Sequence, residues 1–285
     1  MSIVYLNGDF LPIENAKISP LDRGFLFGDG IYEVIPSYEG KMVGLKGHLN
    51  RMFNGLTEIG IVVNKTAKQW TLLCEKLCQL NNYGALGIYI HISRGTDTKR
   101  HHAYPQGITP TIFMMTFEIP VPITPDCKTA KGYSLISTED LRWQRCHIKS
   151  TALLGNVMHF QQGYEANCNE TLLYNDKLEL TEASSSNIYI VKNEVLITPK
   201  LDNQILPGIT RDILLAILRD EGSINIEERV VTLAEVKDAD EIWISSSSKE
   251  IAPVTVLDGK KVGDGKVGKI WQKAATLYSN NKFNY

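Results

Sequence analysis

Residues 142–151, with the sequence RWQRCHIKST, place the strongest constraint on this chain because they predict a short strand that leads directly into a helix. Lys149 would lie at the corner, on the same side of the strand as Arg145 and His147. Cationic neighbours and a helix N-terminus both disfavour an ammonium ion, so this position favours a nucleophilic lysine that forms a Schiff base. The alternative is a solvated lysine at the end of a strand, which is the commoner case for a lysine considered alone.

A helix is predicted from residue 152 to about residue 166, with Ser150 and Thr151 as its capping residues. Its apolar residues recur at the spacing of an amphipathic helix. They are Leu153, Leu154, Val157, Met158 and Phe160.

The composition is that of an ordinary globular protein. The chain has 285 residues, 43% of them hydrophobic and 22% charged, which is enough for one large or two moderate domains. Its 30 basic and 32 acidic side chains nearly cancel, which argues against nucleic acid as a partner. No apolar run approaches the length that spans a membrane, and the first residues lack the order of a signal peptide, so no membrane partner is expected.

The five cysteines predict neither disulfides nor a metal site. Their number is odd, and Cys74 and Cys78 are one helical turn apart rather than at metal-ligand spacing. This usage is typical of a reducing cytoplasm, which we expect as the location of the protein.

A proline-rich segment predicts the domain boundary. Residues 118–125 contain three prolines, which favour a stiff, extended connector. We therefore expect a first domain at residues 1–117, a linker at 118–124 and a second domain at 125–285.

The first domain is predicted to mix strands with two helices, at residues 48–59 and 68–80. A glycine-rich stretch at 24–30 precedes a strand that contains Tyr32; a phosphate-binding loop would precede a helix instead. Arg51 lies off the apolar face of its helix, as a solvated arginine would. The remaining expected strands are residues 3–10, interrupted by a turn at 7–8, and residues 41–45, 87–93 and 110–117.

The second domain is predicted to contain strands at residues 133–137, 170–174, 178–182, 188–191 and 241–244. Thr210 is placed to cap a helix at 213–221, and the free amides of such a helix start favour an anion. The serines at 245–248 form a polar turn that could also donate hydrogen bonds to a phosphate.

Four motifs occur in order along the chain: residues 22–34 (DRGFLFGDGIYEV), 146–150 (CHIKS), 182–187 (EASSSN) and 206–211 (LPGITR). Together they resemble the fold-type IV, class IV aminotransferases dependent on pyridoxal 5′-phosphate (PLP), and among these the D-amino acid aminotransferases. The likeness runs from the turn at residues 7–8 to DGKVG at residues 264–268. It implies an α/β fold of two domains, an N-terminal α/β sandwich and a C-terminal pseudo-barrel, with PLP in the cleft between them and homodimers whose active site lies at the subunit interface.

The resemblance also implies roles for single residues. Lys149 corresponds to the lysine that forms the aldimine with PLP, and Glu182 to the carboxylate that pairs with the ring nitrogen and keeps it protonated. The remaining cofactor residues are implied to be Arg51, Ile209, Thr210 and Ser247 at the phosphate and Leu206 on the ring face. No metal is implied.

Substrate choice is implied to depend on the loop at residues 96–105. Arg100 and His102 match an Arg-x-His pair that reaches across from the partner subunit and, with Tyr32, holds the substrate carboxylate. The loop is one residue longer than the common version, and His101 competes with His102 for this role. The implied reaction is ping-pong transamination between D-amino acids and 2-oxo acids. The alternatives are an L-branched-chain aminotransferase, a 4-amino-4-deoxychorismate lyase and a PLP-binding protein without turnover.

Overall fold

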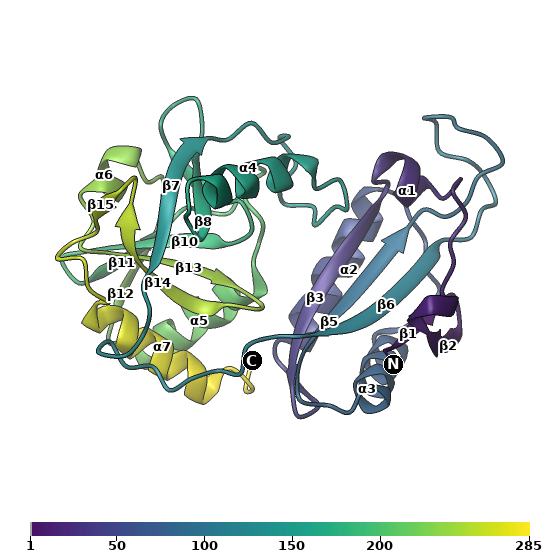
Figure 1. Cartoon of the computed structure of the whole chain (residues 1–285), viewed down its shortest axis with the longest axis horizontal. Coiled ribbons are helices and arrows are strands. Elements are labelled where there is room, and N and C mark those ends of the chain that lie inside the picture. Colours follow the sequence, from purple (N-terminus) through teal and green to yellow (C-terminus); the bar gives the residue numbers. More distant parts are fainter. Residues whose placement is uncertain (1) are drawn as a thin grey trace. The chain divides into compact units, whose positions relative to one another are not determined.

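The structure, a computed structural model, describes residues 2–285. The chain divides into two compact units, one formed by Met1–Val121 with Ile148–Leu153 and the other by Pro122–His147 with Leu154–Tyr285 (Figure 1). The segment Ile148–Leu153 therefore belongs to the first unit although both its neighbours in sequence belong to the second. The sequence did not indicate that this short segment returns to the first unit. The expected limits of the two domains and the linker stay a prediction.

The first unit contains an antiparallel sheet of six strands in the order β2-β1-β6-β5-β3-β4. Its strands are β1 (Ile3–Leu6), β2 (Asp9–Pro12), β3 (Gly30–Tyr38), β4 (Lys41–Met42), β5 (Ala85–Ser93) and β6 (Thr111–Glu118). Its helices are η1 (Ile13–Asn15), α1 (Arg23–Phe27), α2 (Leu45–Glu58) and α3 (Ala67–Leu80). The predicted helices at 48–59 and 68–80 and the interruption at 7–8 are confirmed.

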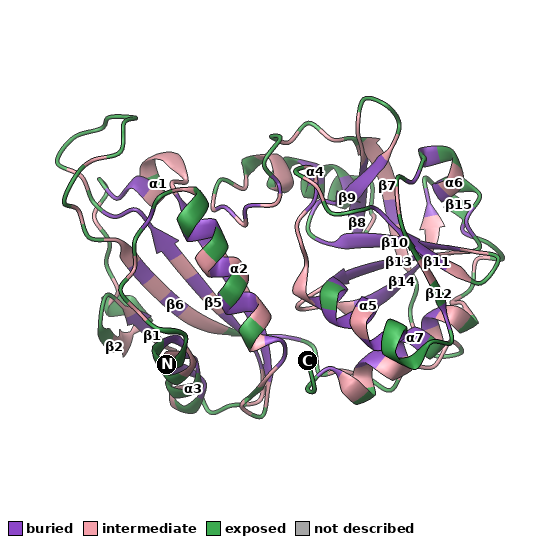
Figure 2. Ribbon diagram, turned by 180° about the vertical axis from the view of Figure 1, so that it is seen from behind, coloured by how far each residue is buried: buried purple, intermediate pink, exposed green. Residues whose placement is uncertain are grey.

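Helices α2 and α3 cover one face of this sheet and close its core (Figure 2). Successive side chains of a strand point to opposite faces, so Ile31, Glu33 and Ile35 of β3 face the helices while Tyr32 and Val34 face away. Glu33 is thus a carboxylate placed in an apolar core. It requires charged partners on the helices that cover it.

The second unit contains a sheet of nine strands that curls into a half-barrel, with β12-β11-β10-β13-β14-β7-β8-β9 as its main path. Its strands are β7 (Tyr133–Glu139), β8 (Glu170–Tyr174), β9 (Leu180–Ala183), β10 (Asn187–Lys192), β11 (Val195–Thr198), β12 (Asn225–Glu228), β13 (Glu241–Ser246), β14 (Glu250–Leu257) and β15 (Lys260–Lys261). Its helices are α4 (Leu154–Glu165), α5 (Ile209–Glu221), α6 (Leu233–Lys237) and α7 (Lys269–Asn281). Helices α5 and α7 pack on β13 and on each other.

Two expectations for residues 142–166 are wrong. Residues 142–149 form turns and bends rather than a strand, and helix α4 begins at Leu154 rather than at residue 152. Ser150 and Thr151 consequently do not cap α4, and Lys149 is not at a helix N-terminus. The apolar face of α4 is also exposed: Leu154, Val157, Met158 and Phe160 are between 41% and 72% exposed.

Candidate active site

Lys149 lies on the open edge of strand β3 in the first unit. Tyr32 donates its backbone N–H to the Lys149 carbonyl at 2.9 Å, and the Thr151 N–H reaches the Gly30 carbonyl at 3.0 Å. The segment Ile148–Leu153 thereby continues the sheet beyond the point where β4 ends. Lys149 Nζ lies 4.1 Å from the centroid of the Tyr32 ring, so the structure brings these two predicted site residues together.

The glycine-rich motif permits this close packing. Gly28 ends α1 with a φ of 65°, in the left-handed region, and a Cβ at this position would lie 3.0 Å from the Ala152 Cα atom. Thr151 Oγ1 donates to the Gly28 carbonyl at 2.9 Å. The glycines therefore make room for the segment that carries Lys149. This packing role agrees with the expectation that they do not form a phosphate-binding loop.

Arg51 is held by a buried ionic group in the core of the first unit. Its guanidinium donates two hydrogen bonds to the Glu33 carboxylate, at 2.8 and 2.7 Å, and the His48 ring nitrogen lies 2.7 Å from the same carboxylate. Burial alone would raise the pKa of Glu33, but the charge and hydrogen bonds of Arg51, with His48, lower it well below its ordinary value of 4.5. Burial lowers the pKa of His48, so a neutral imidazole donates to an ionised Glu33.

We expect Glu33→Gln to lower the free energy of unfolding by about 3–5 kcal/mol at neutral pH, because it leaves Arg51 buried without its counterion. A carboxyl whose pKa is depressed in the folded state stabilises the protein above its unfolded pKa, near 4.5, and this contribution is lost as the pH falls further. The difference between wild type and variant should therefore narrow below pH 4.5 in urea-unfolding measurements. Glu39→Gln, an exposed change just beyond β3, is the matched control; equal stability of both variants would contradict the assignment.

Arg23 fixes the loop at residues 96–105. Its guanidinium donates to the carbonyl oxygens of His101, His102 and Ala103, the second of these at 3.1 Å, and its Nε pairs with Asp29 at 2.7 Å. The motif at residues 22–34 therefore holds the backbone of this loop through Arg23, in addition to packing beside the segment that carries Lys149.

Arg100 and His102 both pack on Phe27 of helix α1. The Arg100 guanidinium lies 5.0 Å and the His102 ring 5.3 Å from the Phe27 ring centroid. Among residues 2–285, no hydrogen bond, ion pair or ring contact joins either side chain to Tyr32 of the same chain. The structure thus places Arg100 beside His102 but does not bring the pair onto Tyr32.

Glu182 is fixed in the second unit by Arg142, whose side chain is 3% exposed. Arg142 donates to Glu182 Oε1 at 2.7 Å and also pairs with Asp140 at 2.7 Å, while the Leu206 N–H donates to Glu182 Oε2 at 3.0 Å. Burial raises the pKa of Glu182, and the Arg142 guanidinium opposes that rise. A carboxylate accepts about four hydrogen bonds, so Glu182 retains capacity for another donor.

Helix α5 begins at Ile209 with Gly208 as its N-cap, so the expectation that Thr210 is the cap is wrong. No side chain caps this helix, and the amides of Ile209 and Thr210 lie in the first turn, which has no intrahelical carbonyl partners. A Cβ at Gly208 would lie 1.9 Å from Asn187 Oδ1, so only glycine permits this approach. Asn187 donates to the Leu206 carbonyl at 2.9 Å and thereby joins the helix start to the Glu182 group.

Ser247 lies at the same end of the sheet. Asn187 on β10 is paired with Ser245 on β13, and Ser247 follows in the turn after β13. Among the described residues, no hydrogen bond of the protein involves the hydroxyl of Ser247. The second unit therefore links Glu182, Leu206 and the α5 N-terminus through hydrogen bonds, and Ser247 follows two residues after Ser245, the strand partner of Asn187.

A model of the family Amino-transferase class IV matches residues 30–257. This chain belongs to the class IV aminotransferases. It is 40% identical over 270 residues to a D-alanine aminotransferase of Staphylococcus epidermidis, a match that covers 95% of this chain and 94% of the relative. It is 36% identical over 278 residues to a D-alanine aminotransferase of Bacillus licheniformis, covering 98% and 96% of the two chains.

Solved structures show the same fold for this aminotransferase. A branched-chain aminotransferase of Thermoproteus uzoniensis superposes with a TM-score of 0.87 at 24% identity, covering 100% of this chain and 96% of the other. A Legionella pneumophila protein, solved as a proposed 4-amino-4-deoxychorismate lyase, gives a TM-score of 0.83 at 23% identity, covering 94% of this chain and 97% of the other. Another branched-chain amino acid aminotransferase, with a TM-score of 0.91 at 21% identity, was solved with pyridoxamine 5′-phosphate. The predicted family, the fold-type IV architecture, the enzyme class and the PLP cofactor are confirmed.

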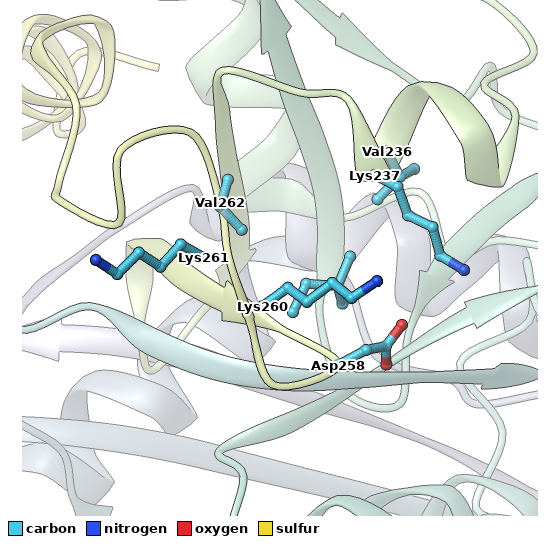
Figure 3. A pocket seen from close by; sticks show the side chains of 7 residues that line it. Val236, Lys237, Asp258, Lys260, Lys261 and Val262 are labelled. Atoms are coloured by element: carbon cyan, nitrogen blue, oxygen red, sulfur yellow. The ribbon is translucent and has the colours of Figure 1, made fainter.

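A separate hollow of the aminotransferase shares no residue with the predicted site. It has a volume of about 210 Å³ and lies beside α6 and β15, where apolar residues meet the side chains of Lys237, Lys260, Lys261 and Asp258 (Figure 3). Across residues 2–285, no group of three or more His, Cys, Asp or Glu side chains is arranged to hold a metal ion.

Sequence reasoning missed the residues that hold the predicted site residues of this aminotransferase in place. Glu33 and His48 hold Arg51, Arg23 holds the loop of Arg100, and Arg142 holds Glu182. Three of them carried a signal: Arg23 and Glu33 fall inside the first motif, and Arg142 begins the stretch that leads to Lys149. Glu33 is in addition the single charged residue of the apolar stretch at 31–35, a feature that could have identified it.

Proposed function

We propose that this protein is a PLP-dependent transaminase that moves the amino group between D-amino acids, such as D-alanine and D-glutamate, and 2-oxo acids, such as 2-oxoglutarate and pyruvate. The observation that carries the proposal is the 36–40% identity to D-alanine aminotransferases across 95% or more of the chain. The branched-chain aminotransferases and the lyase are below 25% identity and support the fold alone.

The second unit fits a phosphate group. The uncapped start of α5 supplies backbone N–H donors at the positive end of a 13-residue helix, and the unengaged Ser247 hydroxyl supplies a further donor. Gly208 keeps the approach to this helix start free of a side chain. By the family resemblance, Arg51 of the first unit, which Glu33 orients, would supply a positive charge to the phosphate, and Leu206 an apolar side chain to the ring.

Lys149 and Glu182 carry the chemistry in this proposal. Bound PLP supplies an electron sink for the carbon that loses its proton. Lys149 Nζ would hold the cofactor covalently between turnovers and, when free, take up the proton from the substrate Cα atom. Glu182 would keep the ring nitrogen protonated, with Arg142 fixing the direction of its carboxylate.

We expect Glu182→Gln to lower kcat on the order of 100-fold or more at saturating substrate, because an amide does not hold a proton on the ring nitrogen. The KM for D-alanine should change far less, since Glu182 does not bind the substrate carboxylate. Steady-state kinetics with 2-oxoglutarate as acceptor check this. A wild-type kcat in the variant would remove Glu182 from the ring-nitrogen role.

We also propose a homodimer whose partner subunit completes the substrate site. The exposed apolar residues of α4, extended by Tyr164 at 68% exposure, form a surface of the kind that partner subunits cover. Arg100 and His102 do not contact Tyr32 within one chain, so delivery of this pair by the partner is the arrangement that uses all three residues. Sedimentation analysis should find two copies per particle.

Within residues 2–285 no helix is both long enough and apolar enough to cross a bilayer.

We propose a cytoplasmic location on the basis of the cysteines. The five cysteines are all free, and Cys74 and Cys78 are buried on α3. Free thiols in this number suit a reducing compartment.

The choice of amino donor tests the proposal. With 2-oxoglutarate as acceptor, we expect kcat/KM for D-alanine to exceed that for L-leucine by about 100-fold or more, since one orientation of the carboxylate directs only one Cα–H at the base. Preference for L-leucine would favour the alternative hypothesis, an L-branched-chain aminotransferase. Formation of pyruvate from 4-amino-4-deoxychorismate without an acceptor would favour the lyase, and PLP binding without turnover a non-catalytic protein.

A further inference from the structure

The turn that carries Ser247 needs support from outside its own hairpin. It joins β13 to β14 through Ser247, Ser248 and Lys249, with Ser246 paired to Glu250. Glu250 has a φ of 53°, in the left-handed region, where a residue other than glycine costs about 1 kcal/mol or more. The conformation of this turn is therefore not the one that its sequence favours by itself.

Lys249 supplies part of this support. Its Nζ atom lies 3.6 Å from Glu170 Oε2 and donates to Ser185 Oγ at 3.3 Å. Its backbone N–H also donates to Ser246 Oγ at 3.3 Å. The Lys249 side chain is 21% exposed and reaches a carboxylate that is fully buried, so solvent screens this ion pair less than it screens a pair on the open surface.

Glu170 on β8 organises a second turn. Its carboxylate accepts hydrogen bonds from the hydroxyls of Ser184, Ser185 and Ser186, the second at 2.6 Å. These serines follow Glu182 in the chain after one intervening residue, Ala183. Among the described residues Lys249 is the cation paired with Glu170, and a buried carboxylate that loses its cation is strongly destabilised.

We propose that Lys249 is a positioning residue which, through Glu170, holds the Ser247 turn in the conformation that binds the PLP phosphate. The ion pair ties the turn after β13 to the turn that follows Glu182, so both ends of the cofactor are bound by one connected group. Neither Glu170 nor Lys249 lies in the four motifs shared with the family. The inference rests on the proposed function, and specifically on phosphate binding by Ser247.

The test is a titration of PLP-free protein with PLP and, separately, with pyridoxal, which lacks the phosphate. We expect Lys249→Met to raise the Kd for PLP about 10-fold or more, as loss of a hydrogen-bonded charge typically does, and to leave the Kd for pyridoxal within about twofold. Lys249→Arg keeps the charge and should restore PLP binding to within about threefold of wild type.

A double-mutant cycle separates support through Glu170 from direct contact with the phosphate. If Lys249 acts through Glu170, then Lys249→Met should have little further effect on PLP binding in the Glu170→Gln background. If Lys249 instead touched the phosphate directly, Lys249→Met would raise the Kd for PLP by the same factor in wild type and in Glu170→Gln. That result would overturn the inference. The double variant removes both charges and leaves no unpaired buried ion, so it keeps the test available if Lys249→Met does not fold.

Lys261→Met is the matched control. It removes the same charge from an exposed lysine on β15, which pairs with the opposite end of β14. Its PLP affinity should equal that of wild type. If wild type itself binds no PLP, the proposed function fails; if wild type binds PLP and Lys249→Met binds it equally well, only the positioning role fails.

Discussion

Replacement of Lys149 by alanine is expected to lower the transamination rate on the order of 10⁴-fold while PLP still binds. The loss is large because the variant lacks both the group that would hold the cofactor covalently and the base that would take the Cα proton. Binding should persist because the groups proposed to bind the phosphate, Arg51 and the start of α5, are not changed by the substitution. Single-turnover assays and PLP titration of the variant measure the two effects separately.

The attachment point of the cofactor provides an independent check. Borohydride treatment of wild type followed by peptide mapping should find the pyridoxyl group on Lys149. Lys46→Ala, which removes an exposed lysine of α2 in the same unit, should keep full activity. A pyridoxyl group on any other lysine would contradict the assignment, whatever the activity of Lys149→Ala.

Much of the fold could be predicted because its elements depend on local patterns. The strand expected at 170–174 coincides with β8, and the helix expected at 48–59 overlaps α2. Alternating apolar residues and turn signals such as Asn7-Gly8 act within a few residues and do not depend on distant parts of the chain.

The errors arose where distant residues decide the local structure. Residues 142–149 have strand-forming side chains, but the strand-like pairing occurs at Ile148–Leu153, on an edge of β3 that lies more than 100 residues earlier. Thr210 is a better capping residue than glycine by local rules. Gly208 takes that position because Asn187 fills the space that any larger side chain would occupy.

The residues of the candidate site likewise divide into those that could be predicted from the sequence and those that could not. The family resemblance supplied the residues proposed to touch the cofactor, but not the roles of those that hold them. Arg142 and Glu182 are 40 residues apart, and Arg23 reaches a loop 78 residues away, so the local sequence does not show which residue each arginine contacts. Such supporting residues become visible only when burial shows which charges lack access to water.

Replacement of Arg100 by alanine is expected to cost about 2–5 kcal/mol in transition-state binding of D-alanine, which is about a 30- to 5000-fold loss of kcat/KM. A guanidinium meets a carboxylate with paired, charge-assisted hydrogen bonds, so its removal affects orientation as well as affinity. PLP binding and the proposed dimer should be unaffected, because Arg100 is exposed and its described contact is with the Phe27 ring. Lys99→Ala removes the neighbouring exposed charge and should have little effect.

The two histidines that follow Arg100 complete this test of the carboxylate site. His102→Ala should also lower kcat/KM, but less than Arg100→Ala does, because an imidazole donates one hydrogen bond to a carboxylate where the guanidinium donates two. His101→Ala should change it little. Since the position of the carboxylate determines which Cα–H faces Lys149, Arg100→Ala should also lower the preference for D-alanine over L-alanine. If Arg100→Ala retained both its D-alanine activity and that preference, the carboxylate would have to be bound elsewhere, and the loop at residues 96–105 would not determine the stereochemistry.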